Sequence, residues 1–133
     1  MVQEVEMELV KVVIHEHNEQ QMIHLQEKDG ERGFPIMIGM SEAAEIHRKL
    51  TGFKPMRPLT HDLLANVIES TGSGIERVVI SDLRAGTFYA TIHLRQPTGD
   101  VEGVDARPSD AIALAVQLEA PIFVDEAVFG QLS

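Results

Sequence analysis

The first residues of the chain alternate between apolar and acidic side chains, which predicts a β-strand over residues 4–15. Apolar residues occupy the odd positions from 5 to 9, and glutamates stand between them. This period of two is typical of a strand with one buried face. From Val10 onward the even positions are apolar instead. The change of phase indicates either a bulge near Leu9 and Val10 or a stretch that is buried on both faces.

Several shorter apolar runs predict the remaining strands. Two pairs of runs are each separated by a short segment with glycine and charged residues, as expected of β-hairpins. Two further short runs lie closer to the C-terminus. In chain order, the strands are predicted at residues 21–26, 34–38, 75–83, 87–95, 101–106 and 121–124.

Helical spacing predicts three helices, at residues 41–50, 60–70 and 108–119. Each begins near a hydroxyl residue suited to capping the first turn, namely Ser41, Thr60 and Ser109. In the second helix the predicted apolar stripe consists of Leu63, Leu64, Val67 and Ile68. The third helix is apolar nearly all round and is therefore expected at the centre of the fold. Asp125 is expected to cap a final helical turn.

The order of these elements predicts the fold class. Strands grouped in hairpins, with helices between the groups, favour an α+β protein over a doubly wound parallel sheet. We therefore expect a mixed, largely antiparallel sheet with three to four helices packed on it. The chain has 133 residues and no linker, repeat or low-complexity tract. One domain over residues 1–133 is the simplest organisation for this length.

The amino-acid composition limits the class of protein and the kinds of metal site that are possible. Hydrophobic residues make up 44% of the chain and charged residues 24%, as in ordinary globular proteins. Cysteine is absent, so a metal would need oxygen or imidazole ligands. The N-terminus lacks the basic start and apolar run of a secretion signal, and no stretch reaches membrane-spanning length. We therefore expect a cytoplasmic protein without a membrane partner.

The charge balance counts against simple nucleic-acid binding. Eleven lysines and arginines stand against 21 acidic residues, for a net charge of −10. Such a charge repels polyanions at long range. An enzyme acting on nucleic acid would need a local basic patch or a divalent cation between its carboxylates and the phosphate.

Residues 57–62 form the first segment with candidate chemistry. A proline-containing loop leads to Thr60, His61 and Asp62 at the predicted start of a helix, where unpaired backbone N–H groups attract anions. His61 could serve as general base, general acid or metal ligand. Alternatively, Thr60 and Asp62 only stabilise the helix start and His61 packs near Leu64. Spacing alone favours this second, structural interpretation.

Residues 105–110 repeat the same design. Arg107 supplies a planar guanidinium suited to phosphate or carboxylate, Ser109 is the hydroxyl residue and Asp110 the acid in the first turn. In the structural alternative, Arg107 pairs with Asp105 or Asp110 and Ser109 caps the helix. Two helix starts of the same design in one small domain suggest a shared site between them.

These motifs resemble the bifunctional nuclease domain family. The resemblance rests on RPLTHDLL at residues 57–64, TFYA at 87–90, DARPSDAIALA at 105–115 and APIFV at 120–124. It covers nearly the whole chain. It implies a mixed α/β fold, homodimers and cleavage of both DNA and RNA.

If the chain is a nuclease, the resemblance suggests the following hypothesis for the site. Arg107 and the two helix N-termini hold the phosphate, with Arg57 and Thr60 as further substrate contacts, and His61 transfers a proton. Asp62, Asp105 or Asp110 holds a divalent ion, with magnesium or manganese as candidates, and Ser109 orients or caps.

Two alternatives use the same segments without catalysis. In one, a binding or regulatory domain dimerises and holds an anionic ligand or a protein partner there, which suits the net acidity. In the other, a purely structural dimerisation module places both segments at a subunit interface.

Overall fold

Seven strands form a single mixed sheet in the computed structural model, which describes residues 3–132. The strands are β1 (Glu4–Val13), β2 (Gln20–Glu27), β3 (Gly33–Gly39), β4 (Gly74–Arg84), β5 (Thr87–Arg95), β6 (Val101–Ala106) and β7 (Ile122–Asp125). Their order in the sheet is β3-β2-β1-β7-β4-β5-β6. All neighbours are antiparallel except β4 and β7, which are parallel. The predicted α+β class is confirmed.

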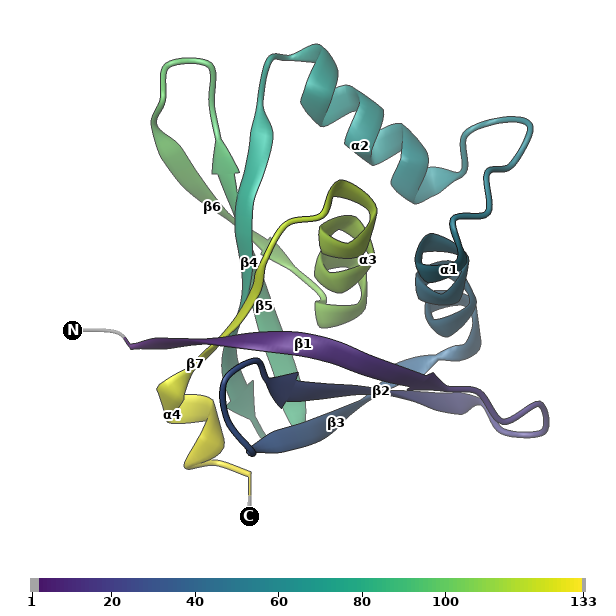
Figure 1. The fold of residues 1–133 in the computed structure, drawn as a ribbon, viewed down its shortest axis with the longest axis vertical. Coiled ribbons are helices and arrows are strands. Elements are labelled where there is room, and N and C mark those ends of the chain that lie inside the picture. Colours follow the sequence, from purple (N-terminus) through teal and green to yellow (C-terminus); the bar gives the residue numbers. More distant parts are fainter. Residues whose placement is uncertain (1–2, 133) are drawn as a thin grey trace.

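Four helices complete the fold: α1 (Met40–Thr51), α2 (Thr60–Ser70), α3 (Pro108–Leu118) and α4 (Glu126–Phe129). Figure 1 shows α1, α2 and α3 together on one side of the sheet and α4 beside β7 near the C-terminus. α3 packs against α1, α2, β4 and β5, whereas α1 packs on β1, β2 and β3. The central position expected for the third helix is confirmed. Within residues 3–132, no helix is both long and apolar enough to cross a membrane.

β7 joins the two hairpin groups into one sheet. It pairs with β1 on one side, where Val124 faces Val5, and with β4 on the other, where Val124 faces Ile80. The sequence predicted β7 but not its position between β1 of the first hairpin group and β4 of the second. A four-residue run carries no information on which neighbours it will pair with, since pairing is set by burial of its faces in the assembled sheet.

The bulge predicted in the first strand is present. The pairing of β1 with β2 shifts between Leu9 and Lys11. The extra residue is Val10, and its side chain is exposed although it is apolar. The alternative of a strand buried on both faces is therefore wrong.

The predicted hydroxyl caps are wrong at three helix starts. The residues at the cap positions are Gly39, Leu59 and Arg107, and none of them makes a side-chain capping hydrogen bond. Ser41, Thr60 and Ser109 therefore lie inside the first turns of their helices. In α3, Pro108 provides a fixed φ and lacks an N–H, so the helix can begin before Ser109. The predicted cap at Asp125 is confirmed, since its carboxylate accepts from the backbone N–H of Ala127 at 2.9 Å.

The sheet curls so that its two outer regions approach each other. Phe34 of β3 and Phe88 of β5 stack with ring centroids 5.5 Å apart. Phe129 of α4 packs edge-on against Phe34 at 5.8 Å. The curl encloses a core of aliphatic side chains from the strands, together with α3, in which every residue from 111 to 115 is buried.

The apolar stripe predicted for α2 is largely exposed. Leu63, Leu64 and Val67 expose 57%, 41% and 50% of their surfaces, whereas Ala65 is buried. The reason is that α2 packs mainly on α3 and lies outside the layer that covers the sheet (Figure 1). A helix with few packing contacts buries only a narrow face.

Burial of α3 should dominate the stability of the fold. Leu114 is fully buried, and replacing it with alanine is expected to lower the free energy of unfolding by about 2–5 kcal/mol through lost burial and a cavity. Leu118→Ala, in the same helix at a residue 38% exposed, is the matched control and should cost clearly less. Urea unfolding followed by circular dichroism measures both. Equal losses would contradict the central position of α3.

Candidate active site

The starts of α2 and α3 meet through a histidine and an aspartate. His61 is the second residue of α2, and Asp110 is the third residue of α3. The His61 Nε2 atom lies 2.8 Å from Asp110 Oδ1. Both side chains are largely buried, with exposed fractions of 16% and 30%. The structure therefore brings together the two segments for which the sequence suggested a shared site.

Arg107 binds the same carboxylate from the other side. Its Nε donates to Asp110 Oδ2 at 3.0 Å, and its Nη2 donates to Oδ1 at 3.3 Å. The remaining Nη1 lies 3.8 Å from a carboxylate oxygen of Glu42 in α1. The Arg107 side chain is 65% exposed, so its outer edge faces solvent while its inner edge holds Asp110.

These contacts decide the charge on Asp110. Burial raises the pKa of this carboxyl, but hydrogen bonds from Arg107 and His61 more than offset that effect, and the net pKa lies below the ordinary value of 3.8. An ionised carboxylate only accepts hydrogen bonds. The Nε2–H of His61 therefore donates to Asp110, which leaves Nδ1 as the basic nitrogen of the neutral ring.

The two helix starts add donors to this region. The first helical backbone bonds are donated by Leu63 in α2 and by Ala111 in α3. Backbone N–H groups that precede them belong to the first turn, which carries the positive end of the helix dipole. Both positive ends therefore converge near the His61–Asp110 pair.

An apolar groove of about 600 Å³ runs from this pair between α2 and β6; we call it the α2–β6 groove. Thr60, His61, Asp105, Arg107 and Asp110 line its polar end. The walls are aliphatic and come from four elements: Leu64 and Ile68 of α2, Ile92 and Leu94 of β5, Val104 of β6 and Leu114 of α3. A ligand in the groove would touch polar side chains at one end only.

A second depression reaches His61 from the side of α1. It has a volume of about 470 Å³ and includes Glu42, Glu45 and Thr60 in its lining. The sequence did not predict that α1 contributes to the site. Its charged residues gave the one indication in the sequence, since Glu45 and Lys49 are four positions apart on one helical face and form an ion pair at 3.3 Å.

Asp62 faces α1 rather than the pair. Its carboxylate binds Lys49 and accepts from the backbone N–H of Leu59 at 2.9 Å. The hydrogen bond from Lys49, followed by that from Leu59, holds the pKa of Asp62 below its ordinary value. These bonds hold the start of α2 against α1, so in this structure Asp62 stabilises the packing of the two helices.

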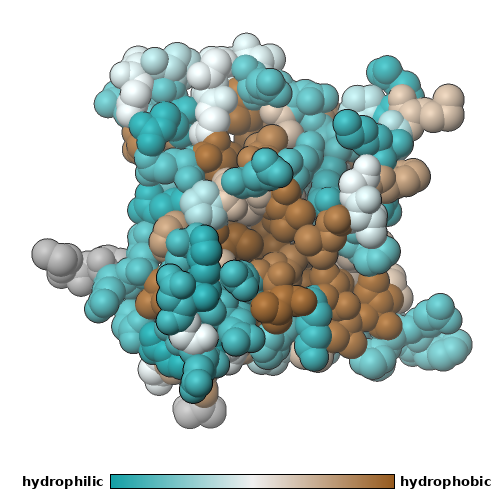
Figure 2. All heavy atoms as spheres, in the orientation of Figure 1, coloured by the Kyte–Doolittle hydropathy of each residue, from teal (hydrophilic) through white to brown (hydrophobic). Residues whose placement is uncertain are grey.

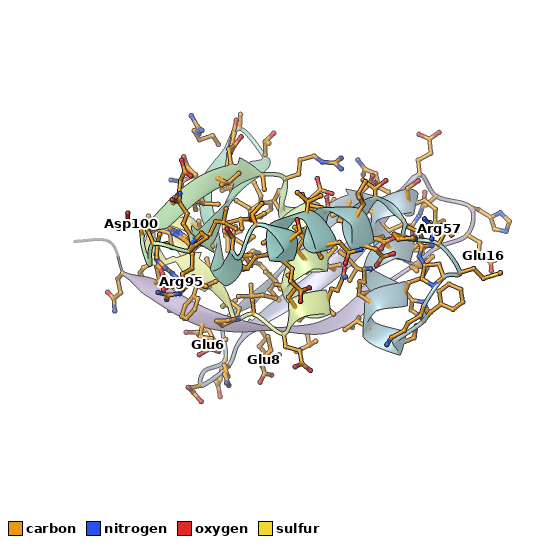
Figure 3. The ribbon with its side chains drawn as sticks, turned by 90° about the horizontal axis from the view of Figure 1, so that it is seen from above. Glu6, Glu8, Glu16, Arg57, Arg95 and Asp100 are labelled. Carbon is orange, nitrogen blue, oxygen red and sulfur yellow. The ribbon has the colours of Figure 1, made fainter. Side chains whose placement is uncertain are left out.

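The remaining candidate residues lie at different places. Thr60 and Asp105 line the polar end of the groove, whereas Ser109 is buried and lines a separate cavity between β3 and the turn that joins β4 and β5. Arg57 is exposed, and Figure 3 shows it projecting from the loop before α2 at the edge of the molecule. The structure therefore gathers His61, Asp110 and Arg107, with Thr60 and Asp105 beside them.

The side chains of residues 3–132 do not fit a metal held by protein ligands alone. No group of three His, Asp or Glu side chains in this range is placed to hold an ion. Both oxygens of Asp110 and both oxygens of Asp62 already accept hydrogen bonds from the protein. Asp62, Asp105 and Asp110 therefore do not form a ready donor set.

Comparison with known proteins defines the family. The model of the bifunctional nuclease domain matches residues 23–133. The chain is also 40% identical over 126 residues to the uncharacterized proteins Rv1829 and MT1877 of two Mycobacterium tuberculosis strains, H37Rv and CDC 1551. Each match covers 95% of this chain and 74% of the relative. The chain belongs to the bifunctional nuclease domain family.

The lowered pKa of Asp110 predicts a pH-dependent contribution to stability. Because the folded-state pKa lies below the ordinary value of 3.8, ionised Asp110 stabilises the fold fully above that value. The contribution is lost as the pH falls through the lower, folded-state pKa. The difference in free energy of unfolding between the native protein and Asp110→Asn should therefore be largest near neutral pH and shrink below about pH 4.

Urea unfolding across that pH range measures the difference. Asp105→Asn is the matched control, because it removes one exposed carboxylate near the same site. A difference for Asp110→Asn that stays constant with pH would show that its ion pairs do not stabilise the folded state.

Proposed function

We propose that the protein hydrolyses phosphodiester bonds of DNA and RNA at the His61–Asp110 pair. The observation that carries the proposal is the 2.8 Å contact between the two side chains at the meeting point of two helix starts, with Arg107 on the same carboxylate. Membership of the bifunctional nuclease domain family supports a nuclease-related activity.

His61 is the general base in this proposal. Its Nδ1 takes a proton from a water molecule while the water oxygen forms a bond to phosphorus. The bond from phosphorus to the leaving oxygen breaks, and that oxygen receives a proton from the His61 ring or from solvent. Asp110 stays ionised, orients the ring through Nε2 and stabilises the positive charge that His61 acquires.

Arg107 and the helix starts stabilise the phosphate. The outer edge of the guanidinium is exposed beside the pair, and an arginine can bind phosphate oxygens with two parallel hydrogen bonds. Backbone N–H groups in the first turns of α2 and α3 supply further donors. These groups would offset the negative charge that builds up on the phosphate oxygens.

The proposal assigns no step to a metal, because the side chains present do not form a donor set. Magnesium or manganese remains a prediction to be tested, since such ions are often bound in part by substrate phosphates. The cytoplasmic location expected from the sequence also stays a prediction.

Cleavage assays test the pair directly. Labelled single-stranded DNA and RNA are incubated with purified protein in magnesium, in manganese and in chelator. His61→Ala and Asp110→Ala are each expected to slow cleavage by about 10²–10⁴-fold, because general base catalysis contributes a factor of this size. His47→Ala removes an exposed histidine from α1 and is the matched control with unchanged activity.

The same experiment also tests the alternative function, a non-catalytic binding domain. Undiminished cleavage by both site variants would rule out the proposed roles of His61 and Asp110. Absence of cleavage by the native protein, together with binding of an anionic ligand that Arg107→Ala abolishes, would identify a non-catalytic binding domain instead. The net charge of −10 is the observation that favours this alternative.

A homodimer is the second part of the proposal. Figure 2 shows hydrophobic side chains gathered on one face, over the region of α3 and β1, with hydrophilic side chains around them. A depression there has an apolar part lined by Leu9, Leu50, Val116 and Ile122, with charged residues such as Glu8 and Lys28 at other places in its lining, and Leu50 is 49% exposed. Exposed apolar areas of this kind often mark protein interfaces.

Sedimentation analysis should give a mass of two chains. Leu50→Glu is expected to shift the equilibrium to the monomer, because it places a charge in the proposed interface. His47→Glu adds the same charge to α1 outside the depression and is the control. A native protein that sediments as one chain at high concentration would contradict the dimer.

A further inference from the structure

Most of the positive charges of this protein are paired with carboxylates of the same chain, which limits the kind of nucleic acid that the protein can bind. Of the 11 lysines and arginines, eight form ion pairs with carboxylates. The eight are Lys28, Arg32, Arg48, Lys49, Arg77, Arg84, Arg95 and Arg107. The other three, Lys11, Lys54 and Arg57, do not line the α2–β6 groove. Among residues 3–132, no unpaired lysine or arginine therefore lines the groove for a long nucleic acid to follow.

The α2–β6 groove limits the size of the ligand at the same place. Its volume of about 600 Å³ lies within the range of about 300–1,000 Å³ that is usual for small-molecule sites. Of the lysines and arginines in residues 3–132, Arg107 alone lines it. The inner edge of Arg107 is bonded to Asp110, but its side chain is 65% exposed, so one phosphate can bind to its outer edge. No second lining cation in this range is present for the next phosphate of a polymer.

The walls of the groove determine which chemical group of the ligand can bind next to the phosphate. Beyond the polar end, the lining is aliphatic, with Leu64, Val104 and Leu114 among its members. Apolar side chains of this kind can hold a nucleobase by its faces, as they do in enzymes that take up a single base. They offer no hydrogen-bond donor or acceptor to the edges of the base, so they cannot read its identity.

We propose that the α2–β6 groove binds one nucleoside next to a single phosphate, so that the protein acts on dinucleotide-sized substrates or chain ends without base preference. The phosphate lies at Arg107 and His61, and the base lies between the aliphatic side chains. This inference rests on the proposed function for the phosphate end of the site. It adds the substrate class, which neither the family match nor the relatives specify.

Binding measurements test the inference separately from cleavage. Calorimetry compares a dinucleoside monophosphate with a long single strand of the same base, and the recovered ligand is checked for cleavage. With one phosphate contact, the affinities per molecule should agree within about threefold, and for the long strand the slope of log K against log salt should be about −0.7. The four homodinucleotides should also bind alike.

Two adjacent leucines provide a matched pair of variants. Leu64 lines the groove and Leu63 does not, although both are exposed residues of α2. Leu64→Glu should weaken dinucleotide binding by about tenfold or more, because it places a charge on an apolar wall. Leu63→Glu adds the same charge and should leave binding unchanged. Val104→Glu, on the opposite wall, repeats the test if Leu64→Glu fails to fold.

The outcomes separate this inference from the proposed function. Binding of the dinucleotide that depends on Leu64 but is not followed by cleavage supports the inference and counts against the nuclease. Cleavage that requires long strands, with a salt slope of about −3 or steeper, supports the nuclease and overturns the inference. No dinucleotide binding, together with loss of a dimer in Leu64→Glu, also overturns it and assigns the groove to a second copy of the chain.

Discussion

The insertion of β7 between β1 and β4 is the pairing on which the rest of the structure depends. Among the strands of residues 3–132, it alone bonds to both hairpin groups, so the continuous sheet exists because these four residues pair on both sides. The curled sheet then provides the surface on which α3 is buried along most of its length. Because α3 is held so firmly, its first turn has a fixed position, and Asp110 lies where α2 can reach it.

The site combines a rigid element with a less buried one. α3 carries Asp110 and is central, whereas α2 carries His61 and exposes much of its apolar stripe. The contact between the two side chains and the bonds of Asp62 to Lys49 and Leu59 fix the start of α2. Local opening requires less free energy where few apolar contacts are buried. Motion of α2 would therefore change access to the groove and the geometry of the pair together.

Electrostatics gives this site a character unlike that of most nucleic-acid interfaces. The surfaces of such proteins usually carry an excess of unpaired lysine and arginine, which supplies much of the affinity through counterion release. Here most cations are paired within the chain, and Glu42 lies near Arg107. Binding energy must therefore come from a few directed hydrogen bonds at one phosphate and from apolar contact in the groove. This combination suits a small ligand better than a polymer.

The sequence alone determined the local structure and the family. Periodicity predicted the strands, the first three helices and the bulge beside Val10, and the capping residue Asp125 predicted the last helical turn, because each depends on residues close together in the chain. The proline-containing segments at residues 57–62 and 105–110 identified His61, Arg107 and Asp110 as candidates. The sequence predicted three helix caps one or two residues too late, because each of these helices begins before its hydroxyl residue.

Only the tertiary structure decided which candidates meet. His61 and Asp110 are 49 positions apart and lie on separate helices, so their contact depends on how α2 packs against α3. Asp62 lies next to His61 in the sequence, yet it faces Lys49, because successive helical side chains point in different directions. The exposure of Leu63 and the shape of the groove likewise depend on α2 packing mainly on α3. Such features are set by packing between distant segments, which hydrophobic periodicity does not encode.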